Sequence, residues 1–172
     1  MNAAIEKLLA TPEPADLGPG PRAGVRSESD IRKAVAALDA EGASAELLLA
    51  LVLLWHDHHE PAHEIAQAIE NADGSYVHAI LHRREPDYWN SKYWFRRVGA
   101  HPAYAELARR VVQLLESRSD RALASKLVPG GRWDAMSFVD ACEAAATGDS
   151  ARRALLQEIQ RIEFETLAAH LS

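Results

Sequence analysis

Histidine and tryptophan, residue types suited to binding metals and ring-shaped ligands, are concentrated in one stretch of the chain. Seven of the eight histidines and three of the four tryptophans lie between Trp55 and Pro102. No histidine and no aromatic residue precedes Trp55. The histidines of this stretch are His56, His58, His59, His63, His78, His82 and His101. Core packing alone does not require this concentration, so we expect any binding or catalytic site to lie here.

One candidate metal site follows from the spacing of His78, His82 and Glu85. Steps of four and three residues place the three side chains on one stripe of a helix. Two imidazoles one turn apart can chelate a divalent ion, and a carboxylate can complete the site. The stripe lies away from the apolar face formed by Val77 and Leu81, so we expect it to be polar or to border a groove. The alternative is a pair of histidines that are either exposed at the surface or hydrogen-bonded.

A second candidate is the segment WHDHHEPAH, residues 55–63. An apolar helix that ends in His56 and Asp57 resembles the central element of HD-type phosphohydrolases, in which adjacent His and Asp bind a metal that activates water. That family needs a histidine on an earlier helix, and none precedes His56, so His78 or His82 would have to replace it. The alternative is a polar helix end, where a histidine cation interacts favourably with the helix dipole. The metal candidates are His78, His82, Glu85, His56, Asp57 and His63.

The third feature is a basic and aromatic segment. From Arg83 to Arg97 the chain has five basic residues and two acidic ones, although its net charge is −6. Guanidinium groups beside aromatic rings can hold a phosphate or carboxylate and stack a planar ring. The same arginines also end two expected helices, where cations are favoured in any case. The predicted ligand-binding residues are His78, His82, Arg83, Arg84, Glu85, Tyr88, Lys92, Tyr93, Arg96, Arg97 and His101.

The run HRREPDYWNSKYWFRRVGAHP, residues 82–102, with WHDHHEPAH upstream of it, resembles a family of uncharacterised bacterial and fungal proteins. The resemblance covers residues 55–104 and carries His-Arg-Arg-Glu, Asp-Tyr, Lys-Tyr-Trp-Phe-Arg-Arg and His-Pro elements. No activity is established for that family, so the resemblance implies no catalytic residue. It does favour treating one set of residues as a single constellation: His78, His82, Arg83, Arg84, Glu85, Lys92, Arg96, Arg97 and His101.

The elements that must position these residues are helices. Helix-forming segments are expected at about 2–10, 27–42, 44–55, 61–70, 75–84, 90–98, 102–117, 134–147 and 150–171. The segment 44–55 is apolar nearly all round and is expected to be central. Residues 11–26 hold four prolines and three glycines and are expected to form a surface loop. We therefore predict an all-α fold for residues 1–172, a single-domain compact array of about seven to nine helices.

Composition narrows the location and the partners. With 172 residues and 48% hydrophobic content, the chain can bury a real core. It has one cysteine, Cys142, and no signal-peptide pattern, so we expect a cytoplasmic protein without an intrachain disulfide. No apolar run is long enough to span a membrane. The acidic balance disfavours duplex nucleic acid as a partner and leaves a homo-oligomer open.

These observations favour one function and leave two others open. The favoured function is binding of a small anionic molecule, with or without one divalent metal ion, in a pocket formed by residues 55–102. The first alternative is an HD-like metal-dependent phosphohydrolase. The second is a non-catalytic protein-interaction module, since Trp, Tyr and Arg are frequent at protein interfaces. The exposure of the aromatic side chains from Tyr88 to Phe95 separates ligand binding from protein interaction. Side chains turned inward around a cavity favour the ligand pocket, whereas an exposed patch favours the interaction module.

Overall fold

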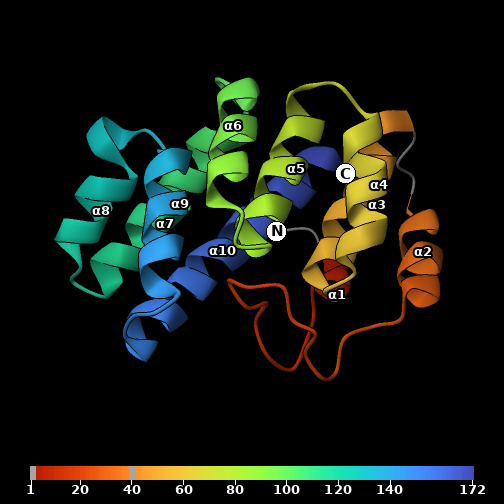
Figure 1. Ribbon diagram of the computed structural model, residues 1–172, viewed down its shortest axis with the longest axis horizontal. Helices are drawn as coiled ribbons and strands as arrows, with labels where there is room; N and C mark the ends of the chain where they lie inside the picture. The colour runs from red at the N-terminus through yellow and green to blue at the C-terminus, as the bar shows by residue number, and fades with distance from the viewer. Residues whose placement is uncertain (1–2, 39–41) are drawn as a thin grey trace.

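The computed structural model describes residues 3–38 and 42–172 (Figure 1), and within these ranges the chain forms ten α-helices, one short 3₁₀ turn and no strand. The all-α prediction is confirmed. The helices are α1 (Ala3–Leu8), α2 (Glu28–Ala36), α3 (Gly42–Trp55), α4 (His59–Ala68), α5 (Ala72–Arg84), α6 (Tyr88–Val98), α7 (Ala103–Ser117), α8 (Arg121–Leu127), α9 (Ala135–Ala145) and α10 (Ser150–Leu171). The extra helix is α8, which lies where a loop was expected between residues 117 and 134.

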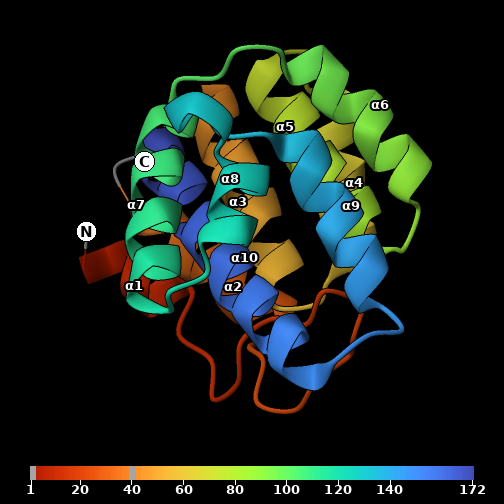
Figure 2. The ribbon, with the colours of Figure 1, turned by 90° about the vertical axis from the view of Figure 1, so that its left-hand side faces the viewer.

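Two helices form the centre of the molecule. Every residue of α3 from Ala50 to Trp55 is buried, as the uniformly apolar sequence predicts. The long C-terminal helix α10 crosses the molecule and packs against α1, α3, α7 and α9 (Figures 1 and 2). Helices α4, α5 and α6 lie on one side of this pair, while α7 and α8 lie on another. The residues of interest are therefore carried by helices that rest on a shared core.

Local sequence explains where the helices of this region begin and end. Helix α4 begins at His59, two residues before the expected start, so Pro61 lies in the first turn, where its missing N–H is not needed. The Asn71 side chain accepts a hydrogen bond from Gly74 N and caps α5. Asp87 caps α6, which begins at Tyr88, two residues before the expected start, and Gly99, with φ of 64°, ends it.

Helix α5 differs most from the expectation. We expected its His78 and His82 stripe to be polar or to border a groove, but every residue from Gly74 to Arg84 is buried. The helix packs against α3, α4 and α6, which together cover it. Its histidine and arginine side chains each find at least one partner inside the protein, although His78 Nδ1 and Arg83 Nε have none within the described ranges.

The segment between α1 and α2 has no helix, as its prolines and glycines predict, and it is held firmly to the core. Ala15 and Leu17 are buried. The Asp16 carboxylate accepts hydrogen bonds from Arg153 and Gln157 of α10. The carbonyl oxygens of Ala15 and Asp16 accept from Gln160.

Across the described ranges, none of the helices has both the length and the apolar character that crossing a bilayer requires.

Candidate metal site

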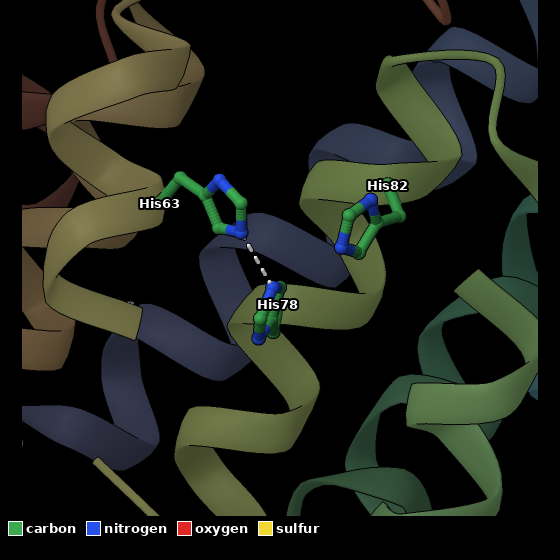
Figure 3. A group of neighbouring side chains, drawn as sticks. All are labelled: His63, His78 and His82. Atoms are coloured by element: carbon green, nitrogen blue, oxygen red, sulfur yellow. Dashed lines mark hydrogen bonds between the residues drawn. The ribbon is translucent and has the colours of Figure 1, made fainter. Parts of the chain in front are cut away.

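Three histidines from two neighbouring helices meet where α4 packs on α5. His63 belongs to α4, and His78 and His82 belong to successive turns of α5. Figure 3 shows the three imidazole rings gathered in the space between the two helices. The Nε2 atoms of His63 and His78 are 2.8 Å apart. One ring nitrogen from each histidine lies within 4.8 Å of the other two, so three nitrogen ligands surround one point.

The spacing of these nitrogens suits a small metal ion. Zinc lies about 2.0–2.1 Å from each histidine nitrogen, which places tetrahedral ligands about 3.3–3.4 Å apart. The nitrogens are separated here by between 2.8 Å and at most 4.8 Å, and this range includes the required value. The Nε2 atoms of His63 and His78 are closer than two ligands of one zinc ion, so metal binding would require these imidazole rings to move apart.

Burial keeps two of these histidines uncharged at neutral pH. His78 is 4% exposed and His82 is 7% exposed. Burial, followed by the nearby His82 and His63, lowers the pKa of His78 to about 3. Burial and then His63 also lower the pKa of His82. A neutral imidazole has a free nitrogen lone pair, which is the form that binds metals.

Carboxylates beside His82 can orient its ring. Its Nδ1 atom lies 3.3 Å from Glu85 Oε2 and 3.9 Å from Asp87 Oδ2. A carboxylate next to one imidazole nitrogen fixes the ring. The other nitrogen, Nε2, lies 3.2 Å from the Asn90 amide nitrogen, so a metal at Nε2 would displace that contact. Burial raises the pKa of Glu85, and His63 acts in the opposite direction. Glu85 is therefore placed to support the cluster through His82, and the structure does not place it among the three converging ligands.

The ring of Trp94 holds His78 from the side of α6. The two rings are nearly parallel, with centroids 4.0 Å apart, and Arg97 lies over the same tryptophan at 5.3 Å. His78 Nδ1 is buried and has no hydrogen-bond partner within the described ranges. The Nε2 atoms of His63 and His78 share one hydrogen bond, so one of them carries a proton and the other accepts it. Because His78 Nδ1 has no competing partner, a proton on His78 can occupy that atom, which frees Nε2 as a ligand.

A second group of possible ligands is built differently. Asp73 Oδ1 accepts hydrogen bonds from His101 Nε2 at 2.8 Å and from His170 Nε2 at 2.9 Å. His101 Nδ1 already accepts from Ala103 N, so its proton lies on Nε2 and points at the carboxylate. This nitrogen has no lone pair for a metal. We therefore assign the Asp73 group to joining the ends of α5, α7 and α10.

Two predicted metal ligands lie in structural contacts. His56 is fully buried, its Nε2 2.8 Å from the Leu8 carbonyl oxygen, and its Nδ1 accepts from Arg26 N at 3.2 Å. Both nitrogens are therefore used. The Asp57 carboxylate accepts from Arg22 and also from Arg84 at 2.8 Å. The structure does not bring His56 and Asp57 to the histidine cluster.

The arginines that we grouped as one constellation separate into buried and exposed pairs. Arg84 binds Asp57 and donates to the carbonyl oxygens of Leu54, Asp16 and Gly18, so it joins three segments inside the protein. Burial lowers the pKa of Arg84 to about 10. Arg83 points toward α10 and forms an ion pair with Glu163 in which neither side chain is exposed. These two arginines are structural.

The remaining predicted residues lie on or next to α6. Lys92 pairs with Asp140 of α9, and Tyr88 is half-buried above Cys142 and Arg153 in a cavity of about 420 Å³. Tyr93, Arg96 and Arg97 are exposed. Trp89 is 74% exposed, while Phe95 is buried and Trp94 half-buried. The aromatic residues of this segment are therefore divided between the core and the surface.

Three cavities among the described residues lie away from the histidine cluster. One of about 820 Å³ is lined by residues of α1, α7 and α10 together with Trp55, and another of about 330 Å³ lies beside Trp133. Neither of these, nor the cavity beside Tyr88, is lined by His63, His78 or His82. The histidine cluster is compact and mostly buried.

Sequence reasoning named every histidine of the cluster and missed the groups that support it. Trp94 and Asn90, whose amide nitrogen lies 3.2 Å from His82 Nε2, carried no signal beyond their membership of the aromatic segment. The acidic partners of other predicted residues, Asp73, Glu163 and Asp140, are 28 to 97 residues from the groups they bind. Comparison with models of protein families, with curated proteins and with solved structures found no match to this chain.

Proposed function

We propose that this protein binds one late first-row divalent metal ion, zinc above all, through His63, His78 and His82. The single observation that carries the proposal is the convergence of three ring nitrogens within 4.8 Å of one another from two helices. Three neutral imidazoles are ligands for zinc, copper or nickel, while magnesium and calcium require oxygen. The burial of His78 and His82 supports the neutral state.

Three protein ligands leave a coordination position for a small anion or water. Zinc sites with three protein ligands are open at the fourth position, whereas structural sites are closed by four. Glu85, whose carboxylate lies beside His82, could accept a proton from bound water. We therefore propose that the anion we expected from the sequence is bound by the metal. Hydrolysis is the corresponding reaction class if the protein is an enzyme.

The HD-like alternative requires different residues. It would use His56 and Asp57, whose ring nitrogens and carboxylate are engaged by backbone groups and arginines. Neither residue belongs to the site of His63, His78 and His82. The two proposals therefore differ in which variants lose the metal, and one set of variants tests both.

The test is metal content and affinity of the purified chain. We expect about one zinc per chain after exposure to Zn, Mn, Fe and Ni salts and removal of excess, measured by elemental analysis. His63→Ala, His78→Ala and His82→Ala should each weaken binding at least tenfold. His170→Ala, a half-exposed histidine of the Asp73 group, is the matched control and should retain the metal.

Three results would contradict the proposal. The first is no stoichiometric metal in the wild-type chain with any of the four ions. The second is loss of the metal in His170→Ala with retention in His63→Ala and His78→Ala, which would move the site to Asp73. The third is loss in Asp57→Asn alone among folded variants, which would favour the HD-like alternative. Circular dichroism of each variant confirms that it is folded.

A further inference from the structure

The outer face of α6 carries an aromatic and basic stripe that metal binding does not explain. Trp89, Tyr93 and Arg96 are spaced four and three residues apart, which places them on one line along the helix, with Arg97 next to it. All four side chains are exposed. Trp89, at 74%, and Tyr93, at 40%, are the exposed large hydrophobic residues of the described ranges. That both lie on one helix, one turn apart, indicates a surface made for a partner.

The two rings of the stripe are arranged for stacking. The Trp89 and Tyr93 rings are 14° from parallel, with centroids 6.4 Å apart. Carbon atoms in contact are about 3.5 Å apart, so a planar ring inserted between two others requires about 7 Å. A small rotation of either exposed side chain provides that distance. A flat aromatic group can therefore stack on one of these rings or between them.

The two arginines at the end of the stripe are not neutralised by the protein. Within residues 3–38 and 42–172, Arg96 has no ion-pair or hydrogen-bond partner, and Arg97 contacts only the ring of Trp94. Most other arginines of the chain pair with a carboxylate, as Arg153 does with Asp16 and Arg118 with Glu158. Two unpaired guanidinium groups in a chain of net charge −6 form a local anion site.

The aromatic and the basic residues of the stripe are close enough along the helix to contact one ligand. Tyr93 and Arg96 are separated by about 4.5 Å of helix rise, at 1.5 Å per residue. A ligand whose ring stacks on Trp89 or Tyr93 can therefore place an attached phosphate against the guanidinium groups. Two unpaired arginines match the charge of one phosphate monoester, while the net charge of −6 opposes binding of a long polyanion.

From these observations we infer that the α6 stripe of Trp89, Tyr93, Arg96 and Arg97 binds a nucleoside monophosphate, with the base on the aromatic rings and the phosphate on the arginines. This inference goes beyond metal binding and does not depend on it. The stripe lies beside the histidine cluster, because Arg97 covers the Trp94 ring that stacks on His78. A bound nucleotide would therefore lie next to the proposed metal.

Isothermal titration calorimetry with AMP tests the inference. We expect AMP to bind wild-type protein with a Kd below about 1 mM, whereas adenosine and ribose 5-phosphate, which each lack one half of the ligand, should bind at least tenfold more weakly. Trp89→Ala should weaken AMP binding about tenfold, since a stacked base contributes on this scale. Arg96→Ala/Arg97→Ala should abolish it. Arg121→Ala/Arg132→Ala, which removes two exposed arginines elsewhere, is the matched control and should bind AMP normally.

The outcomes separate this site from the metal site. Binding of AMP should persist after EDTA treatment and in His78→Ala, and Trp89→Ala should keep the wild-type metal content. The inference is overturned if AMP does not bind at 10 mM, or if Trp89→Ala and Arg96→Ala/Arg97→Ala bind it as the wild type does. It is also overturned if AMP binds only to metal-loaded protein, or if adenosine binds as well as AMP. Binding to anionic lipid vesicles without binding to AMP likewise overturns it.

Discussion

Replacement of Glu163 by glutamine should destabilise the protein more than almost any other single charge change. Glu163 and Arg83 are both 0% exposed, and their carboxylate and guanidinium groups are joined by hydrogen bonds of 2.5 and 3.2 Å. Tyr76 also donates to Glu163, at 3.3 Å. Burial opposes the charge of Arg83, but the Glu163 carboxylate outweighs that effect and raises the pKa of the guanidinium. The variant leaves this cation buried without a counter-ion.

The expected loss in the free energy of unfolding is about 3–5 kcal/mol, the usual cost of breaking a buried ion pair by removing one partner. Two unit charges about 4 Å apart interact by about 4 kcal/mol at an effective dielectric constant of 20, which gives the same scale. A domain of ordinary stability has about 5–15 kcal/mol in total. Glu163→Gln should therefore shift the urea midpoint far toward lower concentration, as measured by circular dichroism.

Two further variants show whether the unpaired charge is the cause. Arg83→Met/Glu163→Leu removes both charges and should recover most of the lost stability, because apolar groups of similar size replace a buried pair at little cost. Glu106→Gln removes one partner of the exposed Arg109–Glu106 pair and should change stability by no more than about 1 kcal/mol. The reasoning would be refuted by a Glu163→Gln variant as stable as Glu106→Gln. It would also be refuted if the double variant lost as much stability as Arg83→Met and Glu163→Leu lose together as single variants.

Three other predictions concern pH, zinc and the cysteine. Because the pKa of His78 is lowered to about 3, its neutral form favours the folded state, and this stability is lost as pH falls below about 6.5. At pH 5 the loss from His78 is about 2 kcal/mol, so thermal melts should show a lower Tm at pH 5 than at pH 7.5, and a difference as large in His78→Gln would contradict the assignment. Zinc at one hundred times its Kd should raise stability by about 2.7 kcal/mol and Tm by roughly 5–10 °C in the wild type, with no rise in His78→Ala. Cys142 is buried, and burial raises its pKa to about 12, so a thiol reagent should label it only when the chain unfolds; rapid labelling of native protein is the contrary result.

The periodicity of apolar residues predicted the fold class because it depends on local sequence. The segment 44–55 is apolar on all sides, and it became the central helix α3. Prolines and glycines predicted that the segment between α1 and α2 has no helix. The caps of α6 were predicted less well, because Asp87 precedes a tyrosine and a tryptophan that gave no sign of a helix start. Asparagine at position 90 was an equally good cap by residue type.

The candidate site was predicted in its members and not in its arrangement. The four-residue step between His78 and His82 is local, so one face of α5 could be foreseen. That His63 would join them depends on the packing of α4 against α5, which the sequence does not encode locally. Arg83 and Arg84 look like surface cations at a helix end, and their burial depends on Glu163 and Asp57, which lie 80 and 27 residues away. Long-range pairing, rather than composition, decided which arginines were available to a ligand.

The anchoring of the N-terminal segment constrains the order in which the chain can fold. Asp16 binds Arg153 across 137 residues of sequence, and its carbonyl oxygen binds Arg84 across 68. The segment between α1 and α2 has no helix of its own to form early, so its anchors can form only once α5 and α10 are in place. Contacts of such long separation form late because their loop-closure entropy must be offset by structure already in place. The segment between α1 and α2 should therefore be among the last of the described residues to acquire its native contacts.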